Sequence, residues 1–226
     1  MKEKKSPSHI LKILLNYIKT KKGGNKIVFT NIYEQNIWAC DESASGSGST
    51  LQQTQVLRQA LENVFVKYNI TSVLDIPCGD FNWMQHVNMQ NIQYIGADIV
   101  PSLIKLNKQK YTIHKRRTFK KLDLTRDKLP NSDIIIVRDC FVHLSFEDIF
   151  HAVRNIKASK SKYLLTTTFT NRKINEDSSN GGWRTLNLQI APFNFPSPIE
   201  IINEECTEDN GSHADKTMAL YYISEM

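Results

Sequence analysis

The sequence predicts an α/β fold: a doubly wound, mostly parallel sheet of seven strands with an antiparallel strand at its C-terminal edge, preceded by an N-terminal helical extension. Two observations support this prediction. Short apolar runs alternate with segments of helical periodicity between residues 50 and 169, a pattern typical of a parallel sheet covered on both faces. The last two apolar runs have no obvious helix between them and suit an antiparallel pair at one sheet edge.

The N-terminal part of the chain is predicted to form the helical extension. Residues 8–20 place apolar side chains at helical spacing and leave a basic remainder. We expect this helix to lie over the main domain; the alternative is that it docks on a membrane surface or a partner. A short strand over residues 26–29 and a flexible Gly- and Ser-rich loop over residues 41–50 follow. The predicted division is an extension with a lid loop at 1–45 and a main domain at 46–226.

The helices of the main domain are predicted from periodicity and from residues that begin helices. Thr50 with Gln53, and Ser145 with Asp148, have the spacing of a capping box. Pro101 occupies an early helical position, where its missing N–H is tolerated. The predicted helices span residues 50–68, 80–87, 101–111 and 145–157.

The strands are predicted from short runs of apolar and β-branched residues. The run from 134 to 137 is entirely apolar, as expected for a strand buried on both faces. Residues 170–197 are rich in Asn, Gly and Pro and are expected to form loops. The predicted strands span residues 72–76, 93–99, 118–124, 133–138, 163–169, 198–203 and 218–224.

Length and composition indicate one cytoplasmic domain. The chain has 226 residues, 40% of them apolar, which suffices for a full core. No stretch approaches 18 consecutive apolar residues, so we expect no membrane span. Near the N-terminus, Lys12 and Asn16 interrupt the apolar run and no small-residue cleavage site follows, so we expect no signal peptide.

The cysteines and histidines give no sign of a metal site. Cys40, Cys78, Cys140 and Cys206 are far apart and form no C-x-x-C pair. Reduced thiols in a cytoplasmic protein are the simpler interpretation. The six histidines show no ligand spacing, so we predict metal-independent chemistry.

The net charge of +6 is concentrated in the first 26 residues and in the run from 105 to 121. Such a run could meet nucleic acid or an anionic substrate. No RNA-binding signature or patterned set of aromatic residues accompanies it. We therefore favour a solvated helix and loop edge and expect no nucleic-acid partner.

Polar residues recur where four successive predicted strands end. Asp75 precedes a tight turn with Gly79, and Asp98 follows 23 residues after Asp75, a separation suited to accepting hydrogen bonds from ribose hydroxyls. Asp123 ends the third strand, where an acid can accept a hydrogen bond from an adenine amino group, and Asp139 follows the fourth. Each acid alone could equally be a surface turn or a helix cap. Together they indicate one ligand crevice beyond the carboxyl ends of the strands.

The turn after the first strand lacks the features that bind phosphate. Gly79 is followed by Asp80, Phe81 and Asn82 instead of further glycines. A pyrophosphate requires several glycine amides at a helix N-terminus, and an acidic turn repels it. No G-x-x-x-x-G-K-[ST] motif exists, which argues against an NTPase. The turn suits a zwitterionic amino acid and a sulfonium better than a dinucleotide.

These segments resemble the class I methyltransferases, which use S-adenosylmethionine. L-D-I-P-C-G-D is similar to that family's first motif, G-A-D-I to its second, L-D-L to its third and D-I-I-I-V-R-D-C-F-V-H-L to its fourth. The resemblance covers residues 46–226 and implies a methyltransferase domain with a lid at 46–57, where the alternative is a linker and a packing helix. It implies a cofactor-binding set of Asp75, Pro77, Gly79, Asp98, Ile99, Asp123, Leu124 and Arg138.

The residues after the fourth and fifth strands are the candidates for handling the acceptor. His143 is the candidate general base, and Asp139 could orient it or bind the acceptor. Their alternatives are a packed first-turn histidine and a helix cap. In the loop after the fifth strand, Trp183 could wall a substrate pocket and Arg184 could grip an anion, unless this loop only packs onto the sheet.

The sequence therefore predicts an S-adenosylmethionine-dependent methyltransferase acting on oxygen or nitrogen of a small molecule, by analogy a sugar or a lipid precursor. Three alternatives stay open. They are an RNA methyltransferase that uses the basic region at 105–121, a catalytically silent nucleotide-binding module and an NAD-dependent oxidoreductase. The sequence does not reveal the acceptor, the methylated atom or the oligomeric state.

Overall fold

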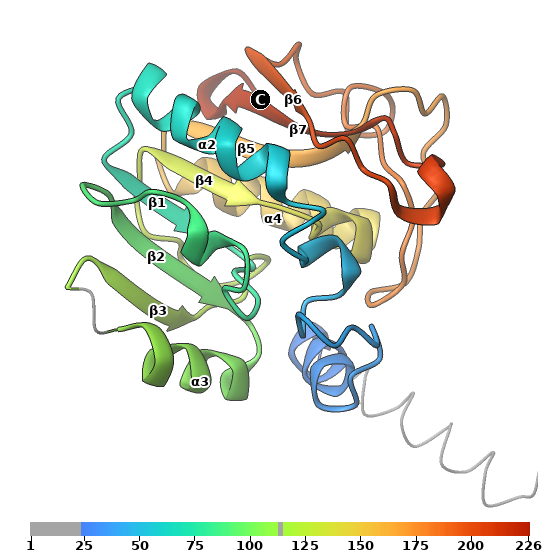
Figure 1. Ribbon diagram of the computed structural model, residues 1–226. Coiled ribbons are helices and arrows are strands. Elements are labelled where there is room, and N and C mark those ends of the chain that lie inside the picture. Colours follow the sequence, from blue (N-terminus) through green and yellow to red (C-terminus); the bar gives the residue numbers. More distant parts are fainter. Residues whose placement is uncertain (1–23, 113–114) are drawn as a thin grey trace, which may run out of the picture.

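Seven strands form one twisted sheet in the computed structural model, which describes residues 24–112 and 115–226 (Figure 1). Their order is β3-β2-β1-β4-β5-β7-β6, and β7 runs antiparallel to both of its neighbours while the other pairs are parallel. This confirms the predicted fold class, with the pair β6 and β7 at one edge. The strands are β1 Ser72–Asp75, β2 Gln93–Asp98, β3 Arg117–Lys121, β4 Ile134–Val137, β5 Tyr163–Phe169, β6 Glu200–Asn203 and β7 Lys216–Tyr222.

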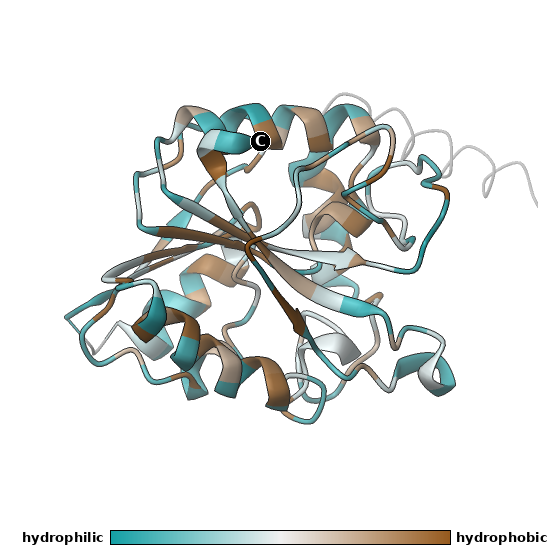
Figure 2. Ribbon diagram, turned by 90° about the horizontal axis from the view of Figure 1, so that it is seen from above, coloured by the Kyte–Doolittle hydropathy of each residue, from teal (hydrophilic) through white to brown (hydrophobic). Residues whose placement is uncertain are grey.

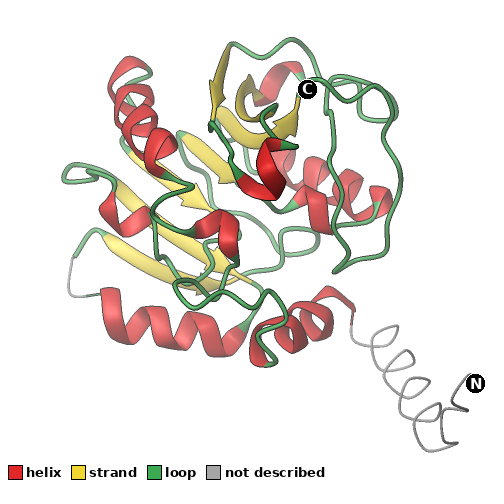
Figure 3. Cartoon of the chain, turned by 45° about the vertical axis from the view of Figure 1, so that its right-hand side comes forward, coloured by secondary structure: helices red, strands yellow, loops and turns green. Residues whose placement is uncertain are grey.

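Helices cover both faces of the sheet (Figure 3). They are α2 Gln55–Lys67, α3 Pro101–Tyr111 and α4 Phe146–Ala158, together with a helical segment at residues 24–34. The predicted cap of α4 is present, since the Asp148 N–H donates to the Ser145 hydroxyl at 3.3 Å. No helix of the described residues is long and apolar enough to cross a membrane.

Alternating side chains of the central strands divide the core into two layers. Val73 and Ile136 face the layer that α2 completes, whereas Leu74 and Ile135 face the layer that α4 completes. All four are almost fully buried, which is why these strands read as continuous apolar runs. Viewed from above, mostly apolar strands lie between helices (Figure 2).

Two predicted elements are wrong. Residues 26–29 belong to the helical segment at 24–34 and not to a strand, because apolar contacts continue at helical spacing: Phe29 packs on the core and Ile32 is buried. Residues 80–87 form turns and one 3₁₀ turn at Met84–His86 instead of an α-helix. Phe81 has a positive φ of 62°, a conformation that cannot continue a right-handed helix.

The remaining differences lie at element boundaries. α2 begins at Gln55, because residues 50–54 form turns. The predicted contact of the Gln53 N–H with the Thr50 hydroxyl exists, at 3.3 Å, but lies within those turns. The helix predicted at residues 8–20 lies outside the described residues.

Candidate functional site

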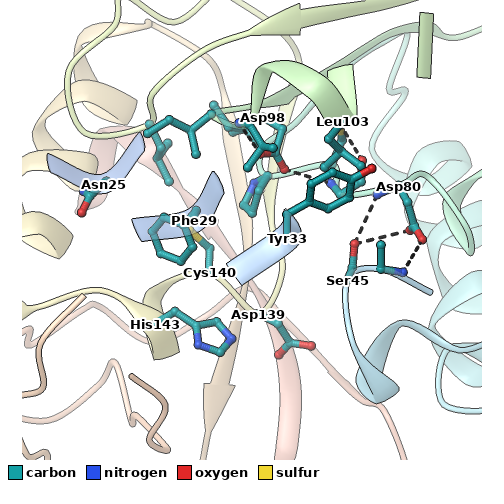
Figure 4. A pocket seen from close by; sticks show the side chains of 18 of the residues that line it. Asn25, Phe29, Tyr33, Ser45, Asp80, Asp98, Leu103, Asp139, Cys140 and His143 are labelled. Atoms are coloured by element: carbon teal, nitrogen blue, oxygen red, sulfur yellow. Dashed lines mark hydrogen bonds between the residues drawn. The ribbon is translucent and has the colours of Figure 1, made fainter. Parts of the chain in front are cut away.

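A pocket opens at the carboxyl ends of the parallel strands, as the switch in strand order between β1 and β4 predicts. The segments after β1, β2, β3 and β4 form its floor, and residues between 25 and 49 cover it. We call it the central pocket. It is open to solvent, and its volume, including the part that solvent occupies, is about 1020 Å³. Figure 4 shows Asp98 and Asp80 on one side of it, and Asp139 and His143 on another.

Most of the residues that the sequence singled out meet here. Asp75 and Arg138 lie beneath the pocket wall and are buried, Trp183 lies in a neighbouring pocket, and Arg184 lines neither pocket. The predicted residues that line the central pocket are Pro77, Gly79, Asp98, Ile99, Asp123, Leu124, Asp139 and His143.

Asp98 is a buried carboxylate fixed by main-chain donors. The Gly79 N–H donates to it at 3.2 Å and the Val100 N–H at 3.0 Å. Burial raises the pKa of Asp98 to about 6, and these two hydrogen bonds only partly oppose that rise. No salt bridge pairs it with a cation among the described residues, so it can accept further hydrogen bonds from a ligand.

Asp75 has a different environment from Asp98 although both end parallel strands. Its carboxylate accepts a hydrogen bond from the Tyr94 hydroxyl at 2.6 Å and is only 2% exposed. Burial raises the pKa of Asp75 to about 7, and the Tyr94 hydroxyl counteracts part of that rise. Asp75 lines neither the central pocket nor the neighbouring one.

The loop after β1 is hydrogen-bonded to the Gly- and Ser-rich loop at residues 41–50, which we call the lid loop. The Ala44 N–H donates to the Asp80 carboxylate at 2.8 Å, and the Ser43 hydroxyl donates to it at 3.0 Å. Gly79 has a φ of +53°, and a Cβ there would come within 2.0 Å of the Ser45 hydroxyl oxygen. Glycine is therefore favoured by the backbone conformation, and a larger residue would also displace the Ser45 hydroxyl.

Asp123 presents one carboxylate oxygen that the described residues leave without a donor. Its Oδ1 accepts from the Thr125 N–H at 2.9 Å and from the Thr125 hydroxyl at 2.7 Å. No hydrogen bond to its Oδ2 is formed by residues 24–112 or 115–226. The carboxylate is therefore oriented by its own turn and available to a ligand donor.

His143 lines the central pocket and the neighbouring one, and its ring is oriented by the main chain. Nδ1 lies 2.7 Å from the Gly182 carbonyl oxygen, which can only accept, so Nδ1 carries the proton and Nε2 has a free lone pair. Burial lowers the pKa of His143, which favours this neutral state. The Trp38 ring packs against it with centroids 5.2 Å apart.

Asp139 is held by two cations and not by His143. Lys216 Nζ lies 2.7 Å from its carboxylate and Arg138 lies 3.3 Å from it. Burial alone would raise the pKa of Asp139, but Lys216 and Arg138 outweigh it and lower the pKa to about 2. Asp139 also has a positive φ of 49°, a strained conformation at a site residue.

A second pocket, which we call the side pocket, adjoins the central one. They share Asp139, His143, Trp38 and Ser45. The side pocket is further lined by Gly46, Ser47, Gly48, Phe169, Trp183, Cys206, Glu208, His213 and Lys216.

The Arg184 guanidinium is hydrogen-bonded to main-chain carbonyl groups. Its guanidinium donates to the Phe141 carbonyl at 2.8 Å and also to the carbonyls of Leu144 and Glu176. It thereby braces the turn that carries His143. This placement gives no support to its predicted grip on an anion.

Sequence reasoning missed several residues at the site. Tyr33 and Trp38 come from a segment predicted as an extension, and Glu208 and Lys216 from segments without any motif. Asp80 directly follows Gly79, and this acidic residue in the turn was the one sign in the sequence of a contact with the lid loop. No group of three or more His, Cys, Asp or Glu side chains among residues 24–112 and 115–226 could hold a metal ion.

Comparison with known proteins supports the fold and indicates a methyltransferase domain. A family model described as a methyltransferase domain matches residues 74–160. A search of curated proteins finds no match. Human N-acetylserotonin methyltransferase in complex with SAM is 13% identical, with a TM-score of 0.53 over 86% of this chain and 58% of that one.

Two further solved structures are similar. The PH0226 protein from Pyrococcus horikoshii OT3 is 13% identical, with a TM-score of 0.56 over 76% of this chain and 89% of that one. The methyltransferase domain of bacterial CtHen1 is 20% identical, with a TM-score of 0.46 over 51% of this chain and 66% of that one. The chain thus spans about two thirds of the length of that domain.

Proposed function

We propose that this chain is a class I methyltransferase dependent on S-adenosylmethionine, and that it transfers the methyl group to an oxygen or nitrogen atom of a small molecule. The observation that carries the proposal is the position of His143. Its neutral ring, with a free lone pair on Nε2, lies where the central pocket and the side pocket meet. One pocket can then hold the donor and the other the acceptor.

The charge of the central pocket fits this cofactor. Four carboxylates line it, those of Asp80, Asp98, Asp123 and Asp139, and no lysine or arginine is among its described lining residues. S-adenosylmethionine has a cationic sulfur and an ammonium group, which such a pocket attracts. A pyrophosphate would be repelled, which argues against an NAD-dependent oxidoreductase.

The proposed cofactor contacts follow from the geometry of the acids. Asp98, buried but with accepting capacity, would hold the ribose hydroxyls. Asp123 would accept from the adenine amino group, with Leu124 beside the base. Pro77 and Gly79 would border the methionine end, supported from beneath by Asp75; Ile99 would line the adenosine and Arg138 would hold Asp139 in place.

The proposed chemistry needs little from the protein beyond positioning and proton removal. When bound, S-adenosylmethionine supplies a methyl group on a sulfur that is already an activated leaving group. His143 Nε2 takes the proton of an acceptor hydroxyl as that oxygen gains the methyl group. Asp139, kept ionised by Lys216, favours the protonated ring that results. The covering residues exclude water from the donor.

A small-molecule acceptor is preferred over RNA. The described residues of the basic region at 105–121 line neither pocket. An RNA acceptor would need phosphate contacts that lead to the site. A sugar or lipid precursor, as the resemblance implies, requires no such surface.

Calorimetry with S-adenosylhomocysteine tests the proposal. Asp98→Ala should bind about 10- to 100-fold more weakly than the wild type, because hydrogen bonds to a carboxylate contribute about 1.5–3 kcal/mol. Glu147→Ala is the matched control, since Glu147 is exposed and lines neither pocket. Equal affinity of all three proteins would contradict the ribose contact, and failure of the wild type to bind would contradict the proposed function.

A further inference from the structure

The side pocket differs from the central pocket in most of its lining residues and lies directly beside it. It adjoins the central pocket along Asp139 and His143. A molecule in it would therefore lie against the candidate base and next to the donor. Its remaining walls come from the lid loop, the end of β5, the loop that carries Trp183, and the start of β7.

One wall of the side pocket is a preformed aromatic platform. Trp183 is 51% exposed although it is one of the largest apolar side chains of the protein. Phe169 contacts its edge, with ring centroids 6.4 Å apart at 90°, and His213 packs on it at 5.0 Å. The Trp183 ring is thus held in place while much of its surface stays accessible to a ligand.

Two polar groups that line the side pocket, Glu208 and His143 Nε2, can accept hydrogen bonds from a ligand. Glu208 accepts from the Ser47 hydroxyl at 2.5 Å and forms no salt bridge with a described cation. His213 Nε2 lies 2.9 Å from the Asp209 carboxylate, and its Nδ1 is buried without a described hydrogen-bond partner, so neither ring nitrogen is open to a ligand. Glu208 and His143 Nε2 therefore call for a ligand that has hydrogen-bond donors.

The charges of the side pocket disfavour an anionic ligand. Lys216 is the one lysine or arginine among its described lining residues. Its ammonium is already 2.7 Å from Asp139 and 3.7 Å from Glu204. A phosphate or carboxylate on the acceptor would therefore meet Glu208 without an available cation.

We propose that the side pocket binds the acceptor and that this acceptor is a neutral sugar. The C–H face of the sugar ring lies on Trp183, while one of its hydroxyls donates to Glu208. A further hydroxyl faces His143: its O–H bond breaks, the proton passes to Nε2, and the oxygen takes the methyl group from S-adenosylmethionine, leaving S-adenosylhomocysteine. This inference rests on the proposed function and names its substrate class.

The test is transfer from S-adenosylmethionine with a labelled methyl group to four sets of compounds. These are neutral hexoses and pentoses with their methyl glycosides, sugar phosphates, phenols and primary amines. We expect label on a neutral sugar, with a KM that is unchanged between about 0.05 and 0.5 M salt, because screening does not affect an uncharged ligand. Binding of S-adenosylhomocysteine is measured in parallel.

Variants then test the pocket itself. Trp183→Ala should raise KM for the sugar about 10-fold and change kcat little, because it removes a stacking surface used equally before and during transfer. Glu208→Gln should also raise KM, whereas Ile174→Ala, an exposed residue of the same loop outside both pockets, should not.

Two results would overturn the sugar assignment without affecting the proposed function. One is no label on any neutral sugar while S-adenosylhomocysteine binds normally, including label found only on phenols, amines or sugar phosphates. The other is a sugar KM that Trp183→Ala leaves unchanged. If S-adenosylhomocysteine does not bind, the proposed function itself fails.

Discussion

At the scale of single residues, the two polar groups between the pockets differ in charge. Asp139 is partly buried beside Lys216 and Arg138, which lower its pKa to about 2, so it stays ionised at any physiological pH. His143, whose pKa burial lowers, stays neutral at pH 7. A neutral imidazole beside a fixed negative charge can accept a proton, and the resulting cation is stabilised by Asp139.

Replacement of His143 tests its role as base. His143→Gln should lower kcat about 10²- to 10⁴-fold, since a positioned base typically contributes that much, while affinity for S-adenosylhomocysteine stays close to that of the wild type. In the wild type, kcat/KM should rise with pH up to the pKa of His143, below its usual 6.5, and level off by about pH 7. Turnover is measured with the acceptor that the screen identifies.

The pH profile separates a base from a structural histidine. The acidic limb should disappear in His143→Gln, because the residue that titrates is gone. A variant that keeps full turnover, or that keeps the same limb, would remove His143 from the mechanism. If turnover falls but the acidic limb of the kcat/KM profile stays, the group that titrates is a residue other than His143.

At the scale of elements, one carboxylate fixes residues 43–45 of the lid loop. Asp80 accepts from the Ser43 and Ser45 hydroxyls and from the Ala44 N–H, so the covering segment is fixed to the loop after β1. This contact links residues that lie more than 30 positions apart in the chain. The loop alone, rich in Gly and Ser, has little reason to adopt one conformation.

Removal of the Asp80 carboxylate should release the lid. In Asp80→Ala we expect faster hydrogen exchange over residues 41–50 and roughly 10-fold weaker binding of S-adenosylhomocysteine, because three hydrogen bonds that order the loop are lost. Exchange followed by mass spectrometry measures this, with Glu147→Ala as control. Unchanged protection of residues 41–50 would show that other contacts hold the lid.

The sequence allowed prediction of the strands and of several site acids for a physical reason. Buried parallel strands need continuous apolar runs, and the residues that follow those runs, Asp98 and Asp123 among them, line the central pocket. The helix predicted at 80–87 was wrong because apolar residues can also be buried one after another by a turn. The left-handed conformation of Phe81 left no signal in the residue type.

Residues brought to the site only by tertiary packing could not be predicted. Lys216 is an isolated lysine at the start of β7, and nothing near it in sequence indicates that it neutralises Asp139. Glu208 enters the side pocket from a 3₁₀ turn with no apolar pattern. Their positions depend on the antiparallel placement of β7 between β5 and β6, which short-range patterns do not encode.

At the scale of the whole molecule, a buried charge network joins the centre of the sheet to its antiparallel edge. Arg138, after β4, lies 2.6 Å from Glu204, after β6, and both are buried. Lys216 at the start of β7 contacts Glu204 at 3.7 Å and Asp139 at 2.7 Å. The edge strands β6 and β7 are thereby joined to the segment that follows β4.

Loss of one member of this network should destabilise the fold much more than loss of a surface ion pair. Glu204→Gln leaves Arg138 and Lys216 buried without their shared carboxylate, and we expect a free energy of unfolding lower by about 3 kcal/mol in urea denaturation. Glu200→Gln is the matched control, because the Lys67–Glu200 pair is exposed, at 61% for the lysine side chain, and should contribute less than about 1 kcal/mol.

The lowered pKa of Asp139 predicts how the stability of the protein changes at acidic pH. Asp139 has a folded-state pKa of about 2, below its ordinary value of 3.8, so the stability it contributes is present above about pH 4 and is lost as the pH falls toward 2. Glu204→Gln removes a negative charge that competes with Asp139 for Lys216. The loss of stability between pH 4 and 2 should therefore persist in that variant, because Asp139 is then the main remaining partner of Lys216. A flat acid profile in Glu204→Gln would contradict the lowered pKa of Asp139.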